Sequence, residues 1–168
     1  AGQGLSLAVA IRAASEADIP SIIEIERTPG FEQFFGWFSE DEHCAHLTDP
    51  DCRVLVLVED GIIEGFAILR GFVHGEGSIR LNRLAARRPG NGAGQQLLDH
   101  AKVLAFAEPS THRFWLRVAE TNSRARHVYE RNGFVLETRL PVGGKSVSGE
   151  PVDIALYGLL REVWKFEF

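Results

Sequence analysis

RRPGNGAGQQLL, residues 87–98, places three glycines at alternate positions between two ordered runs. Ile79–Ala86 before it is predicted to be a strand, and the amphipathic run Leu97–Ala105 after it a helix. A glycine turn at this junction leaves several backbone N–H groups unpaired at the positive end of a helix dipole. Glycine lets an anion come close because it has no side chain. Since Arg87 and Arg88 add positive charge, the stretch predicts a phosphate-binding turn.

Two common nucleotide-binding fingerprints do not fit this turn. A mononucleotide P-loop needs G-x-x-x-x-G-K-[ST], but Gly144-Lys145-Ser146 is preceded by Arg139 where the first glycine is required. A dinucleotide fingerprint needs G-x-G-x-x-G, and the glycines at 90, 92 and 94 have a different spacing. An ordinary strand-to-helix loop, with glycines for backbone geometry, stays open at this point.

A second motif, NSRARHVYERNGF (residues 122–134), follows a short predicted strand, Phe114–Val118. Asn122 suits the N-cap of a helix, and Gly133 suits the position just after its end. Three apolar side chains share one face of this predicted helix: Ala125, Val128 and Tyr129.

In this order and spacing, the two motifs resemble those of the GCN5-related N-acetyltransferase (GNAT) superfamily. The family's second motif, N-x-x-A-x-x-x-Y-x-x-x-G-F, is matched by Asn122, Ala125, Tyr129, Gly133 and Phe134. The resemblance covers about Ile11–Leu159. It implies an α/β (α+β) fold with a mixed, mostly antiparallel central sheet flanked by helices on both faces.

One position departs from the family pattern. The family's glycine turn usually opens with Arg or Gln, as [RQ]-x-x-G-x-[GA], and this chain has Pro89 there. Proline lacks an N–H, so one phosphate donor and one side chain are missing. Arg87 or Arg88 is expected to supply the lost charge, and the N–H groups from Asn91 to Gly94 are expected to remain.

The resemblance implies direct transfer of an acetyl group from acetyl-CoA to a primary amine of a small molecule, or to a protein or peptide amino group. It assigns the oxyanion donor to the N–H near Leu84 and the general acid to Tyr129. No metal is expected. The residues expected to hold the co-substrate are Leu84, Ala86, Arg87, Arg88, Gly90, Asn91, Gly92, Ala93, Gly94, Asn122, Ala125 and Tyr129. Pro89 and the lack of an evident base keep an alternative open, a non-catalytic acyl-CoA-binding regulatory domain.

The general base is not fixed by the sequence. Two positions that hold a glutamate in some family members are Ser78 and Arg117 here. Glu26, Glu76 and Glu120 are candidates by rough location, but each is expected to be a solvated surface carboxylate.

The acceptor is also left open. Arg80 or Arg117, if it faces the cleft, would pair with a substrate carboxylate and favour an amino acid or peptide end. The acidic balance of the chain would instead attract a polyamine or an aminoglycoside. An aromatic cluster lies where family members build the acceptor site: Phe31, Phe34, Phe35, Trp37 and Phe38.

Composition agrees with one acetyltransferase domain over residues 1–168, with residues 1–8 as a disordered lead-in. The 168 residues are 45% hydrophobic and 24% charged, with a net charge of −5, which disfavours a nucleic-acid partner. Two cysteines form no disulfide framework, and no apolar run has the length of a membrane span. A cytoplasmic monomer or homodimer is therefore expected, with no membrane partner.

The remaining elements follow from periodicity and turn residues. His43 and His46 could share a helical face, but no second ligand pair follows, so a solvated helix is expected rather than a metal site. Residues 143–146 are predicted to be a mobile hairpin loop near the acceptor entrance. The other predicted strands are Val9–Arg12, Arg53–Val58 and Ile62–Arg70 around an Asp60-Gly61 turn, Phe134–Leu140 and Val152–Tyr157, and the other helices are one capped by Ser15 and one over Ser39–Leu47.

Overall fold

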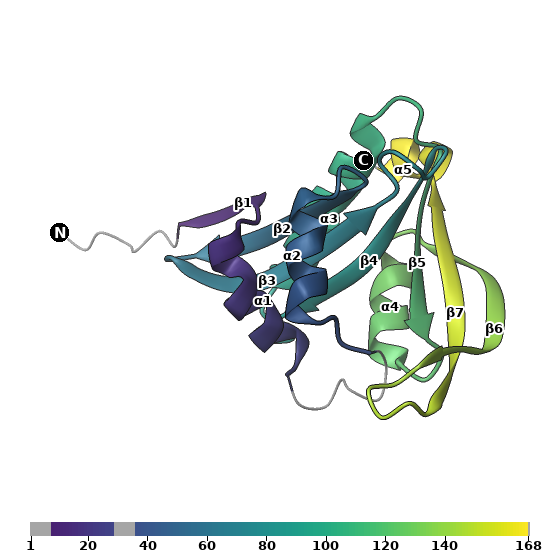
Figure 1. Cartoon of the computed structure of the whole chain (residues 1–168). Coiled ribbons are helices and arrows are strands. Elements are labelled where there is room, and N and C mark those ends of the chain that lie inside the picture. The colour runs from purple at the N-terminus through teal and green to yellow at the C-terminus, as the bar shows by residue number, and fades with distance from the viewer. Residues whose placement is uncertain (1–7, 29–35, 168) are drawn as a thin grey trace.

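The computed structural model describes residues 8–28 and 36–167. Within them, one sheet has the strand order β1-β2-β3-β4-β5-β7-β6 (Figure 1). All neighbouring strands are antiparallel except β4 and β5, which are parallel. The strands are β1 (Val9–Ala13), β2 (Cys52–Glu59), β3 (Ile62–Arg70), β4 (Ser78–Ala86), β5 (Arg113–Ala119), β6 (Val135–Lys145) and β7 (Pro151–Leu160).

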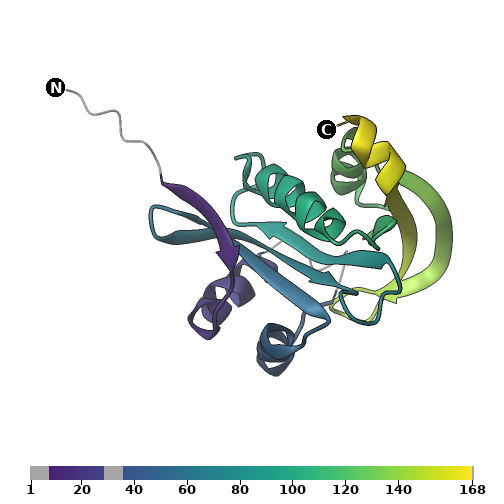
Figure 2. The same ribbon diagram turned by 90° about the horizontal axis from the view of Figure 1, so that it is seen from above.

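Helices cover both faces of this sheet, as Figure 2 shows from above. On one face lie α1 (Ile19–Glu26), which follows a short 3-10 turn η1 (Glu16–Asp18), and α2 (Glu40–Thr48). On the other face lie α3 (Ala93–Ala107), α4 (Ser123–Arg131) and α5 (Arg161–Glu167). The predicted mixed, mostly antiparallel sheet with helices on both faces is confirmed.

Each face of the sheet has its own apolar core. Under α3, the buried face of Leu97, Leu98 and Ala101 packs against β-strand residues such as Phe114 and Leu116. Under α1 and α2, a separate cluster contains Ile19, Ile22, Ile25, Val56 and Phe66. Apolar residues recur every three to four positions in the helices and every two positions in the strands, so their side chains face the sheet or the helices that cover it.

Local signals fixed several element boundaries. The Ser39 side chain accepts the N–H of Glu42 at 3.1 Å, while the Glu42 carboxylate accepts the N–H of Ser39 at 3.0 Å, which closes a capping box at the start of α2. Asp60 and Gly61 have φ of +50° and +80° in the β2–β3 turn, as a tight hairpin requires. No helix among residues 8–28 and 36–167 is both long enough and apolar enough to cross a membrane.

The C-terminal part of the sheet differs from the sequence prediction at its hairpin. Gly143, Gly144 and Lys145 belong to β6 rather than to a loop, and the turn is formed by residues 146–150. A Cβ at Gly143 would lie 2.7 Å from the Leu140 Cβ, so the glycines permit an irregular, closely packed strand. The chain also ends in α5, where Trp164 stacks on Phe106 of α3 at 5.0 Å between ring centroids, so this aromatic residue folds back onto its own domain.

Candidate active site

Strands β4 and β5 pair over only part of their length. Ser78–Leu81 pairs with Arg113–Leu116, and the recorded pairing then stops although the strands continue to Ala86 and Ala119. Figure 1 shows them close together at their start and diverging toward their ends. We call this divergence the β4–β5 fork.

The fork begins at a β-bulge. Leu81 pairs with Leu69 of β3 and Arg83 pairs with Ile68, so Asn82 is an extra residue without a β3 partner. An extra residue of this kind bends its strand, which directs the second half of β4 away from β5.

The backbone of β4 presents two predicted residues to the fork. Arg87 donates its N–H to the Glu64 carbonyl of β3 at 2.7 Å. Because N–H groups of successive strand residues point to opposite sides, those of Leu84 and Ala86 point away from β3, into the fork. There they form an open strand edge, and an extended ligand can pair with such an edge.

The glycine turn connects this edge to α3. Gly90 and Gly92 have φ of +84° and +91°, a conformation that favours glycine, and Gly92 is the N-cap of the helix. The first hydrogen bond of the helix runs from the Gln96 N–H to the Gly92 carbonyl at 3.1 Å. The N–H groups of Ala93 and Gly94 precede it, in the turn where a helix has no carbonyl of its own to offer them.

One of the four expected donors is engaged inside the turn. The Asn91 N–H faces the Arg88 carbonyl at 3.4 Å, a long hydrogen bond. A Cβ at Gly92 would meet only the Gln96 Nε2, at 3.9 Å, so the need for glycine there comes from backbone conformation rather than from crowding.

Helix α4 brings the second motif to the same side of the sheet. Asn122 caps it, since its Oδ1 accepts the Ala125 N–H at 3.2 Å. Ala125 and Tyr129 pack against the core under α3, and the Tyr129 ring meets Phe134 edge-on at 5.7 Å. Burial raises the pKa of Tyr129 to about 12, so its hydroxyl keeps its proton at every physiological pH.

A family model described as "Acetyltransferase (GNAT) family" matches residues 19–134, which include the fork, the glycine turn and α4. The chain belongs to the GNAT family. The resemblance stated from the two motifs is thereby confirmed.

Curated relatives agree with this assignment. An uncharacterized N-acetyltransferase of Mycobacterium tuberculosis (strain ATCC 25618 / H37Rv) is 34% identical over 91 residues, 53% of this chain and 56% of that protein. An uncharacterized N-acetyltransferase of Mycobacterium bovis matches over the same extent. The match thus spans about half the length of these relatives.

Solved structures show the same fold at lower sequence identity. The spermidine N-acetyltransferase from Vibrio cholerae, in complex with CoA and spermine, has a TM-score of 0.78 at 21% identity, with 94% of this chain and 98% of that chain covered. The ribosomal-protein-S18-alanine N-acetyltransferase from Escherichia coli has a TM-score of 0.74 at 20% identity, with 91% and 94% covered. These similarities establish the GNAT fold.

The two basic residues that precede the glycine turn, Arg87 and Arg88, have different partners and different exposure. Arg87 is engaged away from the turn, since its Nη1 lies 2.5 Å from Glu24 of α1 and its Nε donates to the Ile63 carbonyl. Arg88 is exposed and lies 3.4 Å from the largely buried carboxylate of Glu64.

Sequence reasoning missed a third basic residue, Arg124 of α4. A Cβ on Gly90 would lie 3.5 Å from its Nη2, so its guanidinium lies over the turn. A signal was present, because a cation in the first turn of a helix opposes the helix dipole unless an anion binds nearby.

On the opposite face, the candidate base Glu26 is buried, not solvated as expected. It is 1% exposed and its Oε1 lies 2.9 Å from the His43 Nε2 of α2, while its Oε2 lies 3.6 Å from the Arg83 Nε of β4. This carboxylate ties α1, α2 and β4 together. Glu76 is exposed in the β3–β4 loop, and Glu120 forms an ion pair with Arg139 at 3.0 Å.

The prediction of a solvated α2 is wrong for its two histidines. His43 and His46 are 2% and 7% exposed and pack on Phe38. Burial lowers the pKa of His46 and raises that of the Cys52 thiol to about 11. Among the described residues, no cluster of three metal-ligating side chains is found.

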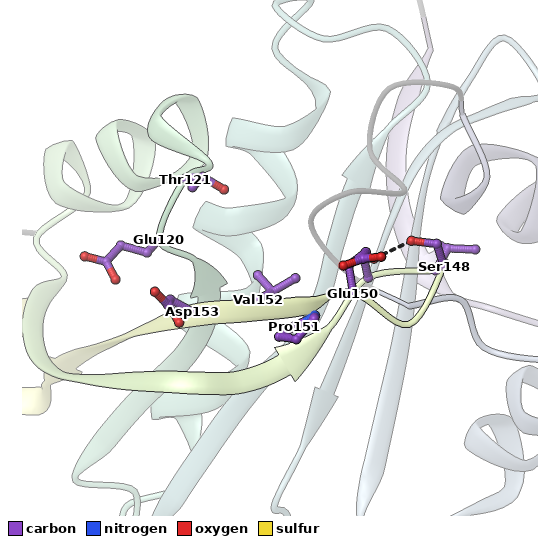
Figure 3. A pocket seen from close by; sticks show the side chains of 9 residues that line it. Glu120, Thr121, Ser148, Glu150, Pro151, Val152 and Asp153 are labelled. Carbon is purple, nitrogen blue, oxygen red and sulfur yellow. Dashed lines mark hydrogen bonds between the residues drawn. The ribbon is translucent and has the colours of Figure 1, made fainter.

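A cavity of about 730 Å³ lies beside the end of β5 and the β6–β7 turn. Figure 3 shows Glu120 and Asp153 on one side of this cavity and Glu150 beside Ser148 at the β6–β7 turn. Of the predicted aromatic cluster, Phe31, Phe34 and Phe35 lie outside the described residues. Trp37 is 41% exposed and Phe38 is half-buried.

Proposed function

We propose that this GNAT chain moves an acetyl group from acetyl-CoA directly to a primary amine of a small molecule or of a protein or peptide. The observation that carries the proposal is the fork, whose open β4 edge leads directly into a glycine turn at a helix N-terminus. An extended chain that ends in phosphates fits both the strand edge and the turn. The backbone N–H groups of the β4 edge would bind the chain, and the helix dipole at the glycine turn would attract the phosphates.

The residues present fit this co-substrate. Gly90 and Gly92 form a turn with left-handed backbone, Arg124 lies above it, and the N–H groups of Ala93 and Gly94 at its end precede the first hydrogen bond of α3. Leu84 and Ala86 would hold the pantetheine arm. Asn122 and Ala125 would contribute through the position of α4 rather than by direct contact.

When bound, acetyl-CoA supplies the activated acetyl carbon. The Leu84 N–H would donate a hydrogen bond to the thioester oxygen as negative charge develops there, an effect typically worth about 10²–10³ in rate. Tyr129 would hold a proton for the departing sulfur, and its raised pKa keeps that proton available.

Several expectations accompany this proposal. Four of them remain predictions: no metal requirement, a single domain over residues 1–168, a cytoplasmic location, and a monomer or homodimer. Direct transfer without a metal agrees with the roles given to Leu84 and Tyr129, since both act by hydrogen bonding or proton transfer.

A calorimetric titration with acetyl-CoA tests the site. Gly92→Asp places a carboxylate in the turn and is expected to abolish binding. Gly61→Asp is the matched control, because Gly61 also has a positive φ of +80° and open space but lies in the β2–β3 hairpin. Equal loss in both variants, or tight binding retained in Gly92→Asp, would contradict the turn as phosphate site.

Release of free thiol from acetyl-CoA in the presence of a mixture of amines tests the activity. Amine-dependent thiol release supports the enzyme. Binding without any such release would support the alternative, a non-catalytic acyl-CoA-binding regulatory domain.

A further inference from the structure

Three arginines lie at the start of the fork, on the face opposite α3. Phe114, Leu116 and Val118 of β5 point into the core under α3, so the alternate residues Trp115 and Arg117 point to the other face. In the same way, Ile79 and Leu81 of β4 point under α3, so Arg80 points to the other face. Beyond the bulge, Arg83 is on this face too, where it stacks on Phe38 and approaches Glu26.

Two of these arginines have no carboxylate partner among the described residues. Arg83 is compensated by Glu26, but no ion pair within 4 Å involves Arg80 or Arg117 in the part of the chain that the structure describes. The Nε atoms of Arg80 and Arg117 are buried and lack a hydrogen-bond partner there. Arg80 rests on the Trp115 ring at 5.2 Å, and Arg117 donates to the Gly143 carbonyl of β6.

This arrangement is electrostatically unfavourable without an anion. Burial, and after it the charges of Arg117, Arg83 and Arg70, lower the pKa of Arg80 to about 10. A charge that is partly withdrawn from water costs free energy unless an opposite charge lies nearby. A ligand carboxylate would supply that charge and could accept from both guanidinium groups.

The position of the pair relative to the fork matters as much as its charge. Arg80 lies within the paired part of β4, opposite Trp115, and Arg117 is the first β5 residue beyond the paired part of β5. Leu84, the proposed oxyanion donor, lies two residues past the bulge on the facing strand. The arginine pair therefore lies at the start of the fork whose β4 edge contains Leu84.

We propose that the acceptor is a small amine that also carries a carboxylate, and that Arg80 and Arg117 bind this carboxylate while the amino group faces the thioester. The proposal rests on the proposed acetyltransferase function. The amino group loses a proton to solvent as its nitrogen–carbon bond forms, the carbon–sulfur bond breaks, and the departing sulfur takes a proton from Tyr129, which then regains one from solvent.

The same charges also bear on the missing base. Positive charges near an amine favour its neutral form, so Arg80, Arg83 and Arg117 together would lower the pKa of the acceptor's amino group. The amine would then lose its proton to solvent, without a dedicated carboxylate base.

A polyamine fits this location poorly, because it has no anionic group and the arginines repel its ammonium groups. Acidic residues do line the cavity of Figure 3, but Glu120 is paired with Arg139 and Asp153 accepts the Val142 N–H at 2.8 Å. Glu120 and Asp153 thus already have partners within the protein, whereas no carboxylate forms an ion pair with Arg80 or Arg117 among the described residues.

Matched acceptors test the proposal directly. Thiol release from acetyl-CoA would be measured with the common amino acids, with 4-aminobutyrate, with their decarboxylated counterparts, such as propylamine for 4-aminobutyrate, with spermidine and with a short peptide. We expect kcat/KM to be about 10- to 100-fold higher for an amino acid than for its decarboxylated counterpart, the range for a hydrogen bond to a charged group. Equal rates for such a pair, or a preference for spermidine or for a peptide amine, would overturn the proposal.

Variants separate the arginine pair from general effects. Arg80→Gln and Arg117→Gln are expected to raise KM for the amino acid about 10- to 100-fold, with a much smaller effect on the reaction of its decarboxylated counterpart and with unchanged CoA affinity. Arg117→Lys should recover part of the loss, because it keeps the charge. Arg53→Gln is the control, since Arg53 lies on the α3 side of β2 and donates to the Pro50 and Cys52 carbonyls.

A binding measurement keeps the two proposals distinguishable. CoA-loaded protein would be titrated calorimetrically with the same amines, which needs no turnover. Carboxylate-dependent binding that is lost in Arg80→Gln, without any thiol release, would leave this site standing and refute the enzyme. No preference for carboxylate-bearing amines in either assay would refute the site.

Discussion

Replacement of Tyr129 by phenylalanine removes the proposed proton donor and little else. The phenyl ring still fills the space against Phe134 and the core under α3, because only the hydroxyl is lost. Loss of a positioned general acid costs about 10²- to 10⁴-fold in rate, equivalent to about 3–5 kcal/mol in activation free energy. We therefore expect kcat to fall by that factor with unchanged acetyl-CoA affinity.

The pH dependence sharpens this test. Burial raises the pKa of Tyr129 to about 12 from an ordinary value of 10, so the hydroxyl stays protonated throughout the assay range and kcat should show no alkaline loss from this residue below about pH 11. Since the folded-state pKa is the higher one, the folded protein loses stability from about pH 10 to pH 12. By the two-unit difference, the loss is about 3 kcal/mol.

The assay combines stopped-time thiol release at saturating amine with urea unfolding at pH 8 and pH 11. The wild type should be less stable at pH 11, and Tyr129→Phe should lack this part of the decrease. A kcat within threefold of the wild type would refute the general-acid role. An identical decrease in stability for both proteins would refute the buried, protonated hydroxyl.

Three further outcomes follow from the structure. The pKa of Asp18 is lowered to about 2, chiefly by the hydrogen bond from Arg12, so Asp18 should stabilise the fold above pH 4 and lose this contribution as pH falls toward 2. The contribution is about 1–2 kcal/mol, because Arg12 is half exposed and solvent screens the pair. In urea unfolding measured against pH, the stability of Asp18→Asn should therefore fall less steeply in acid than that of the wild type. Phe66→Ala should lower the free energy of unfolding by about 3–5 kcal/mol because the side chain is fully buried, whereas Ile62→Ala, 55% exposed, should change it by less than about 1 kcal/mol in the same denaturation series. Gly92→Ala should cost about 1–2 kcal/mol in thermal or chemical unfolding through its φ of +91°, and a neutral result would contradict the left-handed turn.

Local patterns were enough to predict most of the fold. The alternate glycines at 90, 92 and 94, the Asn122 cap and Gly133 each impose a backbone conformation on their own neighbours, so short stretches of sequence carry that information. The hairpin at Asp60-Gly61 and the capping box at Ser39 are of the same kind. Family membership followed because two such local motifs occur in a fixed order.

The rest depends on contacts between distant segments. Glu26 looks like one more polar residue at the end of α1, and only His43 and Arg83, brought in from α2 and β4, make it a buried ion pair. The local sequence around Gly143 and Gly144 predicts a loop, whereas their place in β6 depends on packing against Leu140 and Ile154, which the local sequence does not show. Helix α5 is anchored by Trp164 on Phe106, a contact across 58 positions of sequence.

The arginine pair lies between these two cases. Strand alternation predicts the face of its own strand on which each of Arg80 and Arg117 lies. That the two residues are neighbours depends on the parallel register of β4 and β5. Their lack of carboxylate partners among the described residues is a property of the whole fold, since a glutamate from any other element could have neutralised them.

The short pairing between β4 and β5 also affects how long the protein survives. Four residue pairs join two antiparallel halves of the sheet, and beyond them the β4 edge of the fork has no strand partner among the described residues and can pair with an extended ligand. A ligand that binds the folded state alone stabilises it by about 2.7 kcal/mol at a concentration of 100 Kd. If acetyl-CoA is that ligand, proteases would meet the opened protein about a hundredfold less often in a well-fed cell than in a starved one, and the amount of enzyme would follow the supply of its own co-substrate.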